Sequence, residues 1–254
     1  MLFQGSDRTL NHPETIEFMK ELRAVVDSCP GGRFLVGEVN ATIEHARAHC
    51  VDGRGLNLVF LFRSLKAALN PVAIRALVGQ YERLFPDPLL PTWVFGNHDR
   101  ARRISRLRGD FARAKLNAAW QLTARGVPFL YYGDEIGMVQ RPIPARESKD
   151  ALVQRMAGVP QFVYDAIRAV MGESINRDEC RTPMQWDASP TVGFCPPGVT
   201  PWLPPPADTD GRTVADQAGD PDSLLACYRR FLHARRAHPV LHRGDLTLID
   251  FKEV

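Results

Sequence analysis

Four short apolar segments alternate with segments of helical periodicity, and three of the four lead directly into ionisable residues. The apolar segments are residues 34–39, 56–62, 92–95 and 129–132. Strands that alternate with helices form a parallel sheet with helices packed outside it. Because the carboxyl ends of parallel strands meet on one face, this α/β pattern predicts a cluster of ionisable side chains beside a pocket.

The helices are expected where apolar residues recur every three or four positions. They are residues 12–28, 65–84, 110–123 and 222–236, with a helix-like patch at 151–170. The segment 141–207 holds more than half of the 20 prolines, and we expect a long excursion packed on the sheet rather than a flexible linker. Alternating apolar residues at 246–251 predict the start of a further strand.

Composition excludes several classes of protein. The 254 residues are 44% hydrophobic and 24% charged, which is typical of an ordinary globular chain. A net charge of +3 does not indicate a nucleic-acid partner. No apolar run approaches the roughly 18 residues of a membrane span, so we expect no membrane association. Five cysteines without a CxxC pair favour a reducing, cytoplasmic setting.

Two local patterns have alternative interpretations. Residues 100–108 contain five arginines, which could contact phosphates, but flanking Asp99 and Asp110 favour a solvated helix start with an arginine or two near the pocket. His45 and His49 have the spacing of metal ligands, but no further ligand pair accompanies them. We therefore expect neither a metal nor a cofactor.

The ionisable strand ends suggest one chemistry. They are Glu38, His98 with Asp99, and Asp134 with Glu135. Glycosidic bond cleavage needs paired carboxylates, because one must protonate the leaving oxygen while another stays ionised beside an oxocarbenium-like centre. The strand-end pattern is compatible with this chemistry and does not by itself establish it.

Longer motifs are more specific. Residues 34–39 (Phe-Leu-Val-Gly-Glu-Val), 94–99 (Val-Phe-Gly-Asn-His-Asp) and 126–138 resemble, in that order, the fifth, seventh and eighth strands of glycoside hydrolase family 13, the α-amylase family. Residues 177–187, with Gly193-Phe194 and residues 201–204, resemble its α-glucosidase and oligo-1,6-glucosidase branch. Trehalose synthases share part of this run.

The resemblance implies a fold and a division of the chain. Residues 11–240 would form the C-terminal half of a (β/α)8 barrel, strands five to eight, with the Pro-rich excursion at 141–207. Residues 241–254 would start a C-terminal β-sandwich domain, and residues 1–10 are a lead outside the fold. A half barrel leaves strand edges unpaired, so we expect self-association or binding of the missing N-terminal half.

The resemblance also implies site residues. Glu38 matches the general acid/base, Asp99 the carboxylate that stabilises the transition state, and His98 a residue that hydrogen-bonds sugar hydroxyls. Arg102 stands where related enzymes place an arginine near the sugar or near the stabilising carboxylate. Two aromatic residues, Phe60 and Tyr132, could line the sugar pocket. Asp134 and Glu135 are expected to support the loop, and Trp186 and Trp202 to anchor packing.

One departure from the family pattern is important. The family carries its nucleophilic aspartate at the end of the fourth strand, and nothing before Glu38 resembles a strand ending in Arg-x-Asp. A retaining enzyme needs this nucleophile about 5 Å from the acid. We therefore predict a fragment of a retaining α-glucosidase acting on short α-linked oligosaccharides, inactive alone. Glucosyl transfer of the trehalose synthase or sucrose isomerase type, and a non-catalytic scaffold, remain alternatives.

Overall fold

The computed structural model describes residues 12–156, 158–171, 175–206 and 209–249, and the chain divides into two compact units. Unit 1 comprises Met1–Phe95, Gln121–Phe129 and Ala237–Val254, and unit 2 comprises Gly96–Trp120 and Leu130–Arg236. Each unit is described by itself. Across the described ranges, no helix has the length and apolar character required to cross a bilayer.

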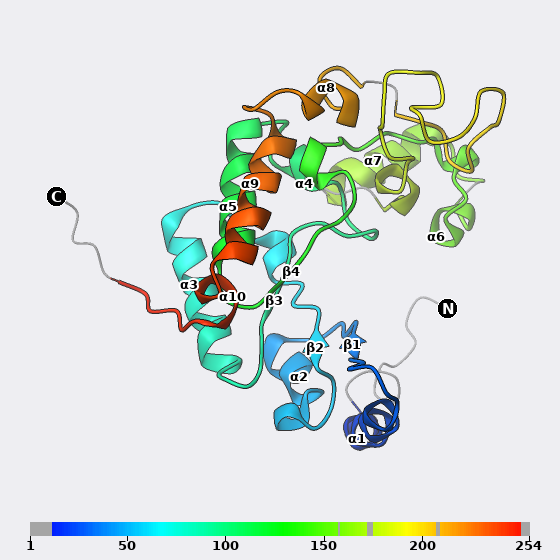
Figure 1. Cartoon of the computed structure of the whole chain (residues 1–254). Coiled ribbons are helices and arrows are strands. Elements are labelled where there is room, and N and C mark those ends of the chain that lie inside the picture. The colour runs from blue at the N-terminus through cyan, green and yellow to red at the C-terminus, as the bar shows by residue number, and fades with distance from the viewer. Residues whose placement is uncertain (1–11, 157, 172–174, 207–208, 250–254) are drawn as a thin grey trace. The chain divides into compact units, whose positions relative to one another are not determined.

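The strands are short and pair in parallel, as the alternating pattern predicts. In unit 1, β1 (Val36–Gly37) pairs with β2 (Leu58–Val59), and β3 (Thr92–Val94) pairs with β4 (Val127–Phe129) (Figure 1). They form two two-stranded sheets rather than one sheet of four strands. Neighbours in space are therefore also consecutive in sequence, as in a barrel wall built from successive strand–helix repeats.

Strands β2 and β3 do not pair through their backbones, and two buried hydroxyl groups form hydrogen bonds there instead. The Thr92 hydroxyl donates to the Val59 carbonyl at 2.7 Å and accepts from the Leu61 amide at 3.0 Å. Nearby, the Ser64 hydroxyl accepts from the Val94 amide at 3.1 Å. The Thr92 and Ser64 side chains therefore satisfy main-chain groups that no neighbouring strand reaches, which a buried backbone requires.

Two strand predictions need correction. The apolar run at 34–39 predicts a strand buried along its length, but β1 spans only Val36–Gly37 and is half-buried, and Phe34 is 64% exposed. Within the described residues β1 pairs only with β2, so its other side lacks a neighbour. The last strand, β4, begins two residues before the predicted 129–132, overlaps it only at Phe129 and includes Pro128. A proline is tolerated there because, among the described strands, β4 likewise pairs on one side only.

Four predicted helices are confirmed, with one boundary shifted. They are α1 (Pro13–Ser28), α3 (Pro71–Leu84), α5 (Phe111–Thr123) and α9 (Leu224–Ala237). Helix α3 begins later than the predicted residue 65, because the Asn70 side chain accepts from the Ala73 amide at 2.8 Å and caps the helix at Pro71. Residues Ser64–Lys66 form a separate 3-10 turn.

The predicted helix-like patch at 151–170 is two helices. They are α6 (Ala151–Gln154) and α7 (Gln161–Met171), and Pro160 stands immediately before the second. The remaining short helices are α2 (Ile43–Ala48), α4 (Arg103–Arg106), α8 (Val214–Ala218) and α10 (Val240–Arg243). Further 3-10 turns are Val51–Gly53, Asp134–Ile136, Ala145–Glu147 and Arg177–Cys180.

Each unit has its own apolar packing. In unit 1 the rings of Tyr81 and Trp93 lie 4.8 Å apart, and both side chains are fully buried. In unit 2 the Pro-rich segment contains a cluster of Ala145, Val153 and Tyr164, with Met156 and Ile175 packed against it. This segment therefore has a core of its own, as expected of a packed excursion and not of a flexible linker.

The strand predicted at 246–251 is absent over the part that can be checked. Residues 246–249 form neither strand nor helix, and residues 250 and 251 lie outside the described ranges. An alternating pattern becomes a strand only where a neighbouring strand accepts its backbone hydrogen bonds, and no described strand pairs with these residues.

Candidate functional site

The predicted site residues are divided between the two units. Glu38 and Phe60 belong to unit 1, whereas His98, Asp99, Arg102 and Tyr132 belong to unit 2. The surroundings of each group can be described within its own unit.

Glu38 and Phe60 follow neighbouring parallel strands in unit 1. Glu38 comes directly after β1 and Phe60 directly after β2, and the Phe60 amide donates to the Gly37 carbonyl at 2.9 Å. Glu38 is exposed and makes no hydrogen bond or ion pair with another described residue. The ring of Phe60 is half-buried and meets Phe129 edge-on, with ring centroids 4.7 Å apart.

Asp99 lies in a cluster of positive and hydrogen-bonding groups. Its Oδ1 atom is 3.0 Å from Arg181 Nη2, 3.3 Å from Arg177 Nη1 and 3.5 Å from His98 Nε2. Its own amide donates to the Asn97 side chain at 3.2 Å, which fixes the turn after β3. No donor from the described part of the chain contacts Oδ2, so one carboxylate oxygen is held and the other is open.

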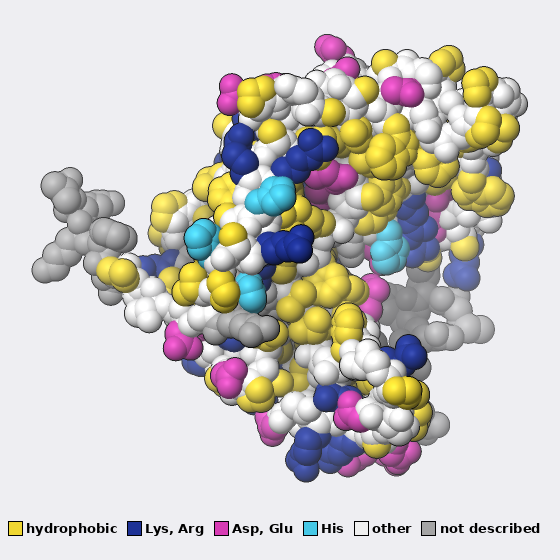
Figure 2. All heavy atoms as spheres, viewed as in Figure 1, with side chains coloured by type: hydrophobic (Ala, Val, Ile, Leu, Met, Phe, Trp, Pro, Cys, Tyr) yellow, Lys and Arg dark blue, Asp and Glu magenta, His cyan; other side chains and the backbone are white. Residues whose placement is uncertain are grey.

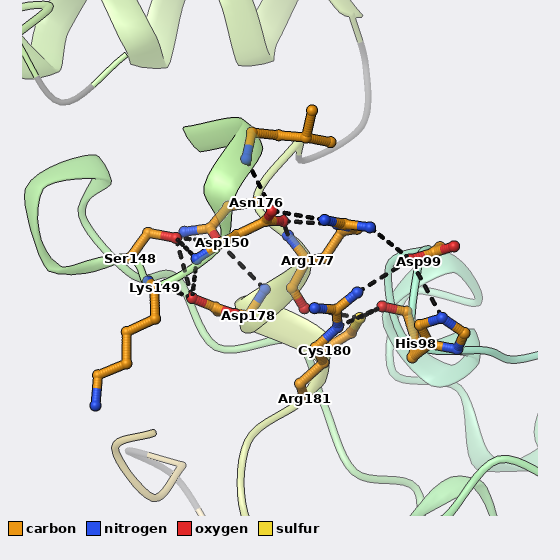
Figure 3. A network of polar contacts seen from close by, with 11 residues as sticks. His98, Asp99, Ser148, Lys149, Asp150, Asn176, Arg177, Asp178, Cys180 and Arg181 are labelled. Carbon is orange, nitrogen blue, oxygen red and sulfur yellow. Dashed lines mark hydrogen bonds and ion pairs between the residues drawn. The ribbon is translucent and has the colours of Figure 1, made fainter. Parts of the chain in front are cut away.

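A second carboxylate lies behind Arg177 (Figure 3). The Asp150 side chain is fully buried and accepts from Arg177 Nη2 and Nε, each at 2.7 Å, and from the Arg177 amide at 3.1 Å. These hydrogen bonds lower the pKa of Asp150 to about 2, because they favour its ionised form. Asp150, Arg177, Asp99 and Arg181 are called the Asp99 network below; their charges alternate in sign.

The backbone that carries Asp150 is fixed by Asp178. One oxygen of Asp178 accepts from the amides of Lys149 and Asp150, at 2.6 and 2.9 Å, and lies 3.0 Å from the Ser148 hydroxyl. Asp178 is itself buried, in the 3-10 turn that also carries Arg177. Residues 148–150 and 176–178 are therefore held together as one polar assembly.

Arg102 contacts the two tyrosines that follow β4. It is 1% exposed, its guanidinium lies 4.9 Å from the Tyr131 ring centroid and 4.6 Å from that of Tyr132, and it donates to the Tyr132 carbonyl. The arginines that contact Asp99 are Arg177 and Arg181. Arg103, the first residue of α4, is also buried, so the expected solvated helix start is wrong for this residue.

Asp134 packs against the turn that leads from β3 to Asp99. Any side chain at Gly96 would collide with the Asp134 carboxylate, so this glycine permits close contact between the residues before Asn97 and the 3-10 turn after β4. Burial raises the pKa of Asp134 to about 6, against the opposing influence of the Arg102 and Arg106 charges. This placement agrees with the structural role expected for Asp134.

An apolar pocket of about 560 Å³ lies in unit 2. It is lined by Tyr132, Glu135, Arg181, Pro183, Met184, Trp186, Phe194, Trp202 and Leu203. Hydrophobic side chains gather on the visible face over the segment between α7 and α8 (Figure 2). Trp186 is 50% and Trp202 75% exposed, so the expectation that both are packing anchors is wrong. Lys149 Nζ lies 3.7 Å from the Trp202 ring centroid.

The pocket adjoins the Asp99 network through one shared residue. Arg181 lines the pocket, contacts Asp99 at 3.0 Å and donates from Nε to the His98 carbonyl at 2.8 Å. The Tyr132 hydroxyl donates to the Thr182 carbonyl at 2.8 Å. Tyr132, predicted as a wall of the sugar site, therefore lies in the pocket beside an arginine of the network.

No candidate metal centre emerges from the described residues. They contain no group of three potential ligands, and the His49 ring nitrogen Nδ1 lies 2.8 Å from the His45 carbonyl. All five cysteines are free.

Sequence reasoning missed Asp150, Arg177 and Arg181 as parts of the site. Arg177 and Arg181 were noted only in a motif that carries the family resemblance, and Asp150 only within a Pro-rich segment. A pattern of neighbouring residues cannot show that they meet Asp99. The available signal was the pair of arginines inside a motif-bearing segment, since the pocket of such a site needs counter-charges for its carboxylates.

The sequence matches the family described as "Alpha amylase, catalytic domain" over residues 2–244. It is 32% identical over 247 residues to a probable α-glucosidase of Rhizobium meliloti (strain 1021), covering 94% of this chain and 42% of that protein. It is 28% identical over 238 residues to a probable oligo-1,6-glucosidase of Bacillus subtilis (strain 168), covering 84% and 42%. The chain thus spans less than half the length of these relatives.

Solved structures show the same partial coverage. The trehalulose synthase MutB of Pseudomonas mesoacidophila MX-45 superimposes with a TM-score of 0.77 at 24% identity, over 94% of this chain and 46% of that one. An isomaltulose synthase of Erwinia rhapontici NX5 gives 0.76 at 23% identity, over 95% and 47%. These likenesses concern the fold.

Proposed function

The chain belongs to the α-amylase catalytic-domain family, and we propose that it carries two of the carboxylates of a retaining α-glucosidase. The solved relatives are (β/α)8-barrel enzymes, and the chain covers only part of them. Glu38 is the general acid/base and Asp99 the carboxylate that stabilises the transition state. The observation that carries the proposal is Asp99, a carboxylate with one oxygen fixed by two arginines and the other open.

The proposed roles match the surroundings of each residue. Asp99 lies beside two guanidinium groups, and in the proposed role its carboxylate faces the positive charge that develops on the sugar. His98 follows the same strand, is half-exposed and can offer a hydrogen bond to a sugar hydroxyl. Glu38 is exposed at the end of β1, where a proton donor can reach a leaving oxygen.

The pocket offers a place for the rest of the substrate. Apolar faces of Trp186, Phe194 and Trp202 can stack against sugar rings, while Arg181 and Glu135 provide polar groups at the wall. We assign this pocket to the portion of a short α-linked oligosaccharide next to the cleaved bond, with Tyr132 as a wall. Phe60 has the corresponding role near Glu38, and Arg102 acts beneath Tyr132 rather than on the sugar.

The proposal places the nucleophile outside this sequence. Before Glu38 the described residues form α1 and β1, and no other strand. We assign β1 to β4 to strands five to eight of the barrel. Because β1 and β4 each pair on one side among the described strands, we expect self-association or binding of the complementary half. The free cysteines support a cytoplasmic setting.

The experiment is complementation. The chain is co-expressed with the residues that precede the matched segment in the Rhizobium meliloti relative, and hydrolysis of p-nitrophenyl α-glucoside is measured. Glu38→Gln and Asp99→Asn should each lower kcat by about 10³-fold or more, whereas Asp165→Asn, which alters an exposed carboxylate on α7, should leave kcat unchanged. Unchanged turnover in Glu38→Gln would refute its assignment.

Glucosyl transfer is a second candidate. The pocket wall beside Arg181 is largely apolar, and apolar surfaces exclude the water that would otherwise intercept a glycosyl intermediate. Product analysis on maltose and on sucrose separates the two: free glucose indicates hydrolysis, and an isomeric disaccharide indicates transfer.

A further inference from the structure

We propose that Asp150 is a positioning residue, which restrains Arg177 so that a single nitrogen reaches Asp99 and the second oxygen of Asp99 stays open to the sugar. The inference deepens the proposed function and rests on the role given there to Asp99. Asp150 contacts no substrate in this proposal; it acts through Arg177 (Figure 3).

The three nitrogens of the Arg177 guanidinium are shared unequally between two carboxylates. Its Nε and Nη2 atoms face Asp150 at 2.7 Å each, which is the paired geometry of a strong arginine–carboxylate contact. The third nitrogen, Nη1, is left for Asp99 and lies at 3.3 Å, close to the limit of a hydrogen bond. Asp150 therefore has the strong, bidentate contact with Arg177, and Asp99 has a weaker, single hydrogen bond.

Without Asp150, Arg177 would be free to turn its paired nitrogens toward Asp99. A guanidinium prefers to contact both oxygens of a carboxylate, and among the described residues Asp99 is the other carboxylate that contacts Arg177. Such a pair would cover Oδ2, the oxygen that faces no donor in the described chain. The proposed stabiliser would then be both occupied and more strongly neutralised.

Asp150 is suited to this restraint because it cannot move easily. Its amide donates to Asp178 at 2.9 Å and to the Ser148 hydroxyl at 3.1 Å, and its Oδ1 accepts from the Leu152 amide at 3.1 Å. Its side chain is fully buried, whereas that of Arg177 is 31% exposed. The fixed partner is therefore the carboxylate, and the group that it orients is the arginine.

The first test uses the chain itself and needs no activity. Aspartate is labelled with ¹³C at Cγ, and the Asp99 resonance is identified by its loss in Asp99→Asn. We expect Asp150→Asn to shift this resonance by more than its linewidth, and Asp150→Glu, which keeps the charge on a longer side chain, to shift it less. In an Arg177→Met background the Asp150→Asn change should leave the resonance in place.

The outcomes are decisive for the restraint. Asp165→Asn is the matched control and should leave the Asp99 resonance unshifted, since this carboxylate is exposed and its hydrogen bond among the described side chains is to Gln161, at 2.9 Å. Equal shifts on Asp150→Asn in the wild-type and Arg177→Met backgrounds would overturn the proposal, because Asp150 would then act on Asp99 without Arg177. An unshifted resonance in Asp150→Asn would also overturn it.

The second test uses the complemented enzyme. Asp150→Asn should lower kcat by about 10- to 100-fold with KM changed less than about threefold, because ground-state binding by the pocket is retained. In the Arg177→Met background the same change should alter kcat less than about threefold, since residues that act through one partner are not additive. Equal losses in both backgrounds would contradict the restraint. Failure of the proposed function shows instead as unchanged turnover in Glu38→Gln and Asp99→Asn, with the resonance shifts intact.

Discussion

Glu38 and Asp99 both follow a parallel strand, yet their surroundings differ sharply. Glu38 stands exposed after β1, without a hydrogen bond to any described residue. Asp99 is one member of a four-residue row of alternating charge, whose far end is a carboxylate buried completely. Among the described residues, no side chain holds the carboxylate of Glu38, whereas that of Asp99 is held by side chains from a segment about 80 residues further along the chain.

The difference shows which part of the site this chain organises by itself. The Asp99 network is complete within unit 2, because residues 148–150 and 176–181 belong to the same compact unit as Asp99. In our proposal the surroundings of Glu38 are completed by residues outside this sequence. Substitutions in the two places should accordingly have unequal effects on the stability of the isolated chain.

The largest expected effect comes from removing the centre of the network. Arg177→Met leaves Asp150 buried without its arginine, and breaking a buried ion pair from one side typically costs about 3 kcal/mol. Urea unfolding monitored by circular dichroism should show this loss. Adding Asp150→Asn should restore most of the lost stability, because the uncompensated buried charge is then removed.

Arg181→Met is the matched comparison. Arg181 and Asp99 are 28% and 32% exposed, so solvent screens their pair and its loss should cost about 1 kcal/mol or less. Equal destabilisation by Arg177→Met and Arg181→Met would contradict the distinction between the buried and the solvated end of the network.

An intermediate effect on the stability of the chain is expected when acid protonates Asp150. The folded pKa of Asp150 is about 2 and its ordinary value is 3.8, so the folded state binds fewer protons between these values. Its contribution of about 2 kcal/mol is present above the ordinary pKa and is lost as pH falls through the folded one. Stability measured between about pH 5 and pH 2 should decline less steeply in Asp150→Asn than in the wild type.

Asp165→Asn provides the control for the acid experiment. It removes an exposed carboxylate of α7 and should reproduce the wild-type decline. If Asp150→Asn also reproduces that decline, the ion pair with Arg177 does not form in solution.

The smallest expected effect concerns Glu38 itself. Because Glu38 is exposed and unpartnered among the described residues, Glu38→Gln should change the unfolding free energy by less than about 0.5 kcal/mol. Asp99→Asn should cost about 1 kcal/mol, since it removes the charge that two arginines face. Thermal melts of the two variants side by side test this ordering. A larger loss in Glu38→Gln would mean that unit 1 depends on a contact of Glu38.

Helices with strong local signals were predictable. α1 and α3 begin at prolines that suit a first turn, and their apolar residues recur with helical spacing. The interruption at Pro160 was locally visible but was outweighed by continuing apolar periodicity around it. Strand bounds were less accurate, because β1 and β4 extend only as far as one neighbour pairs with them.

The network around Asp99 could not be predicted from local pattern. Glu38 and Asp99 were found from motifs at strand ends, but the contact of Arg177 with Asp99 joins residues that share no sequence window. Asp150 precedes a short helix, and its side chain does accept from the Leu152 amide, so a capping role was predictable. Its pairing with Arg177 depends on how a Pro-rich segment folds back, which no periodicity encodes.

The hydrogen bond from the Leu61 amide to the Thr92 hydroxyl makes this amide a reporter of motion between β2 and β3. The Leu61 amide donates to this side chain rather than to a neighbouring strand, so its proton becomes exposed when one rotamer changes. Hydrogen–deuterium exchange at Leu61 therefore follows opening between the two sheets, whereas exchange at the Leu58 amide, which donates to Leu35 in the parallel pair, follows separation of β1 from β2. A single pair of amides can thus distinguish two modes of opening.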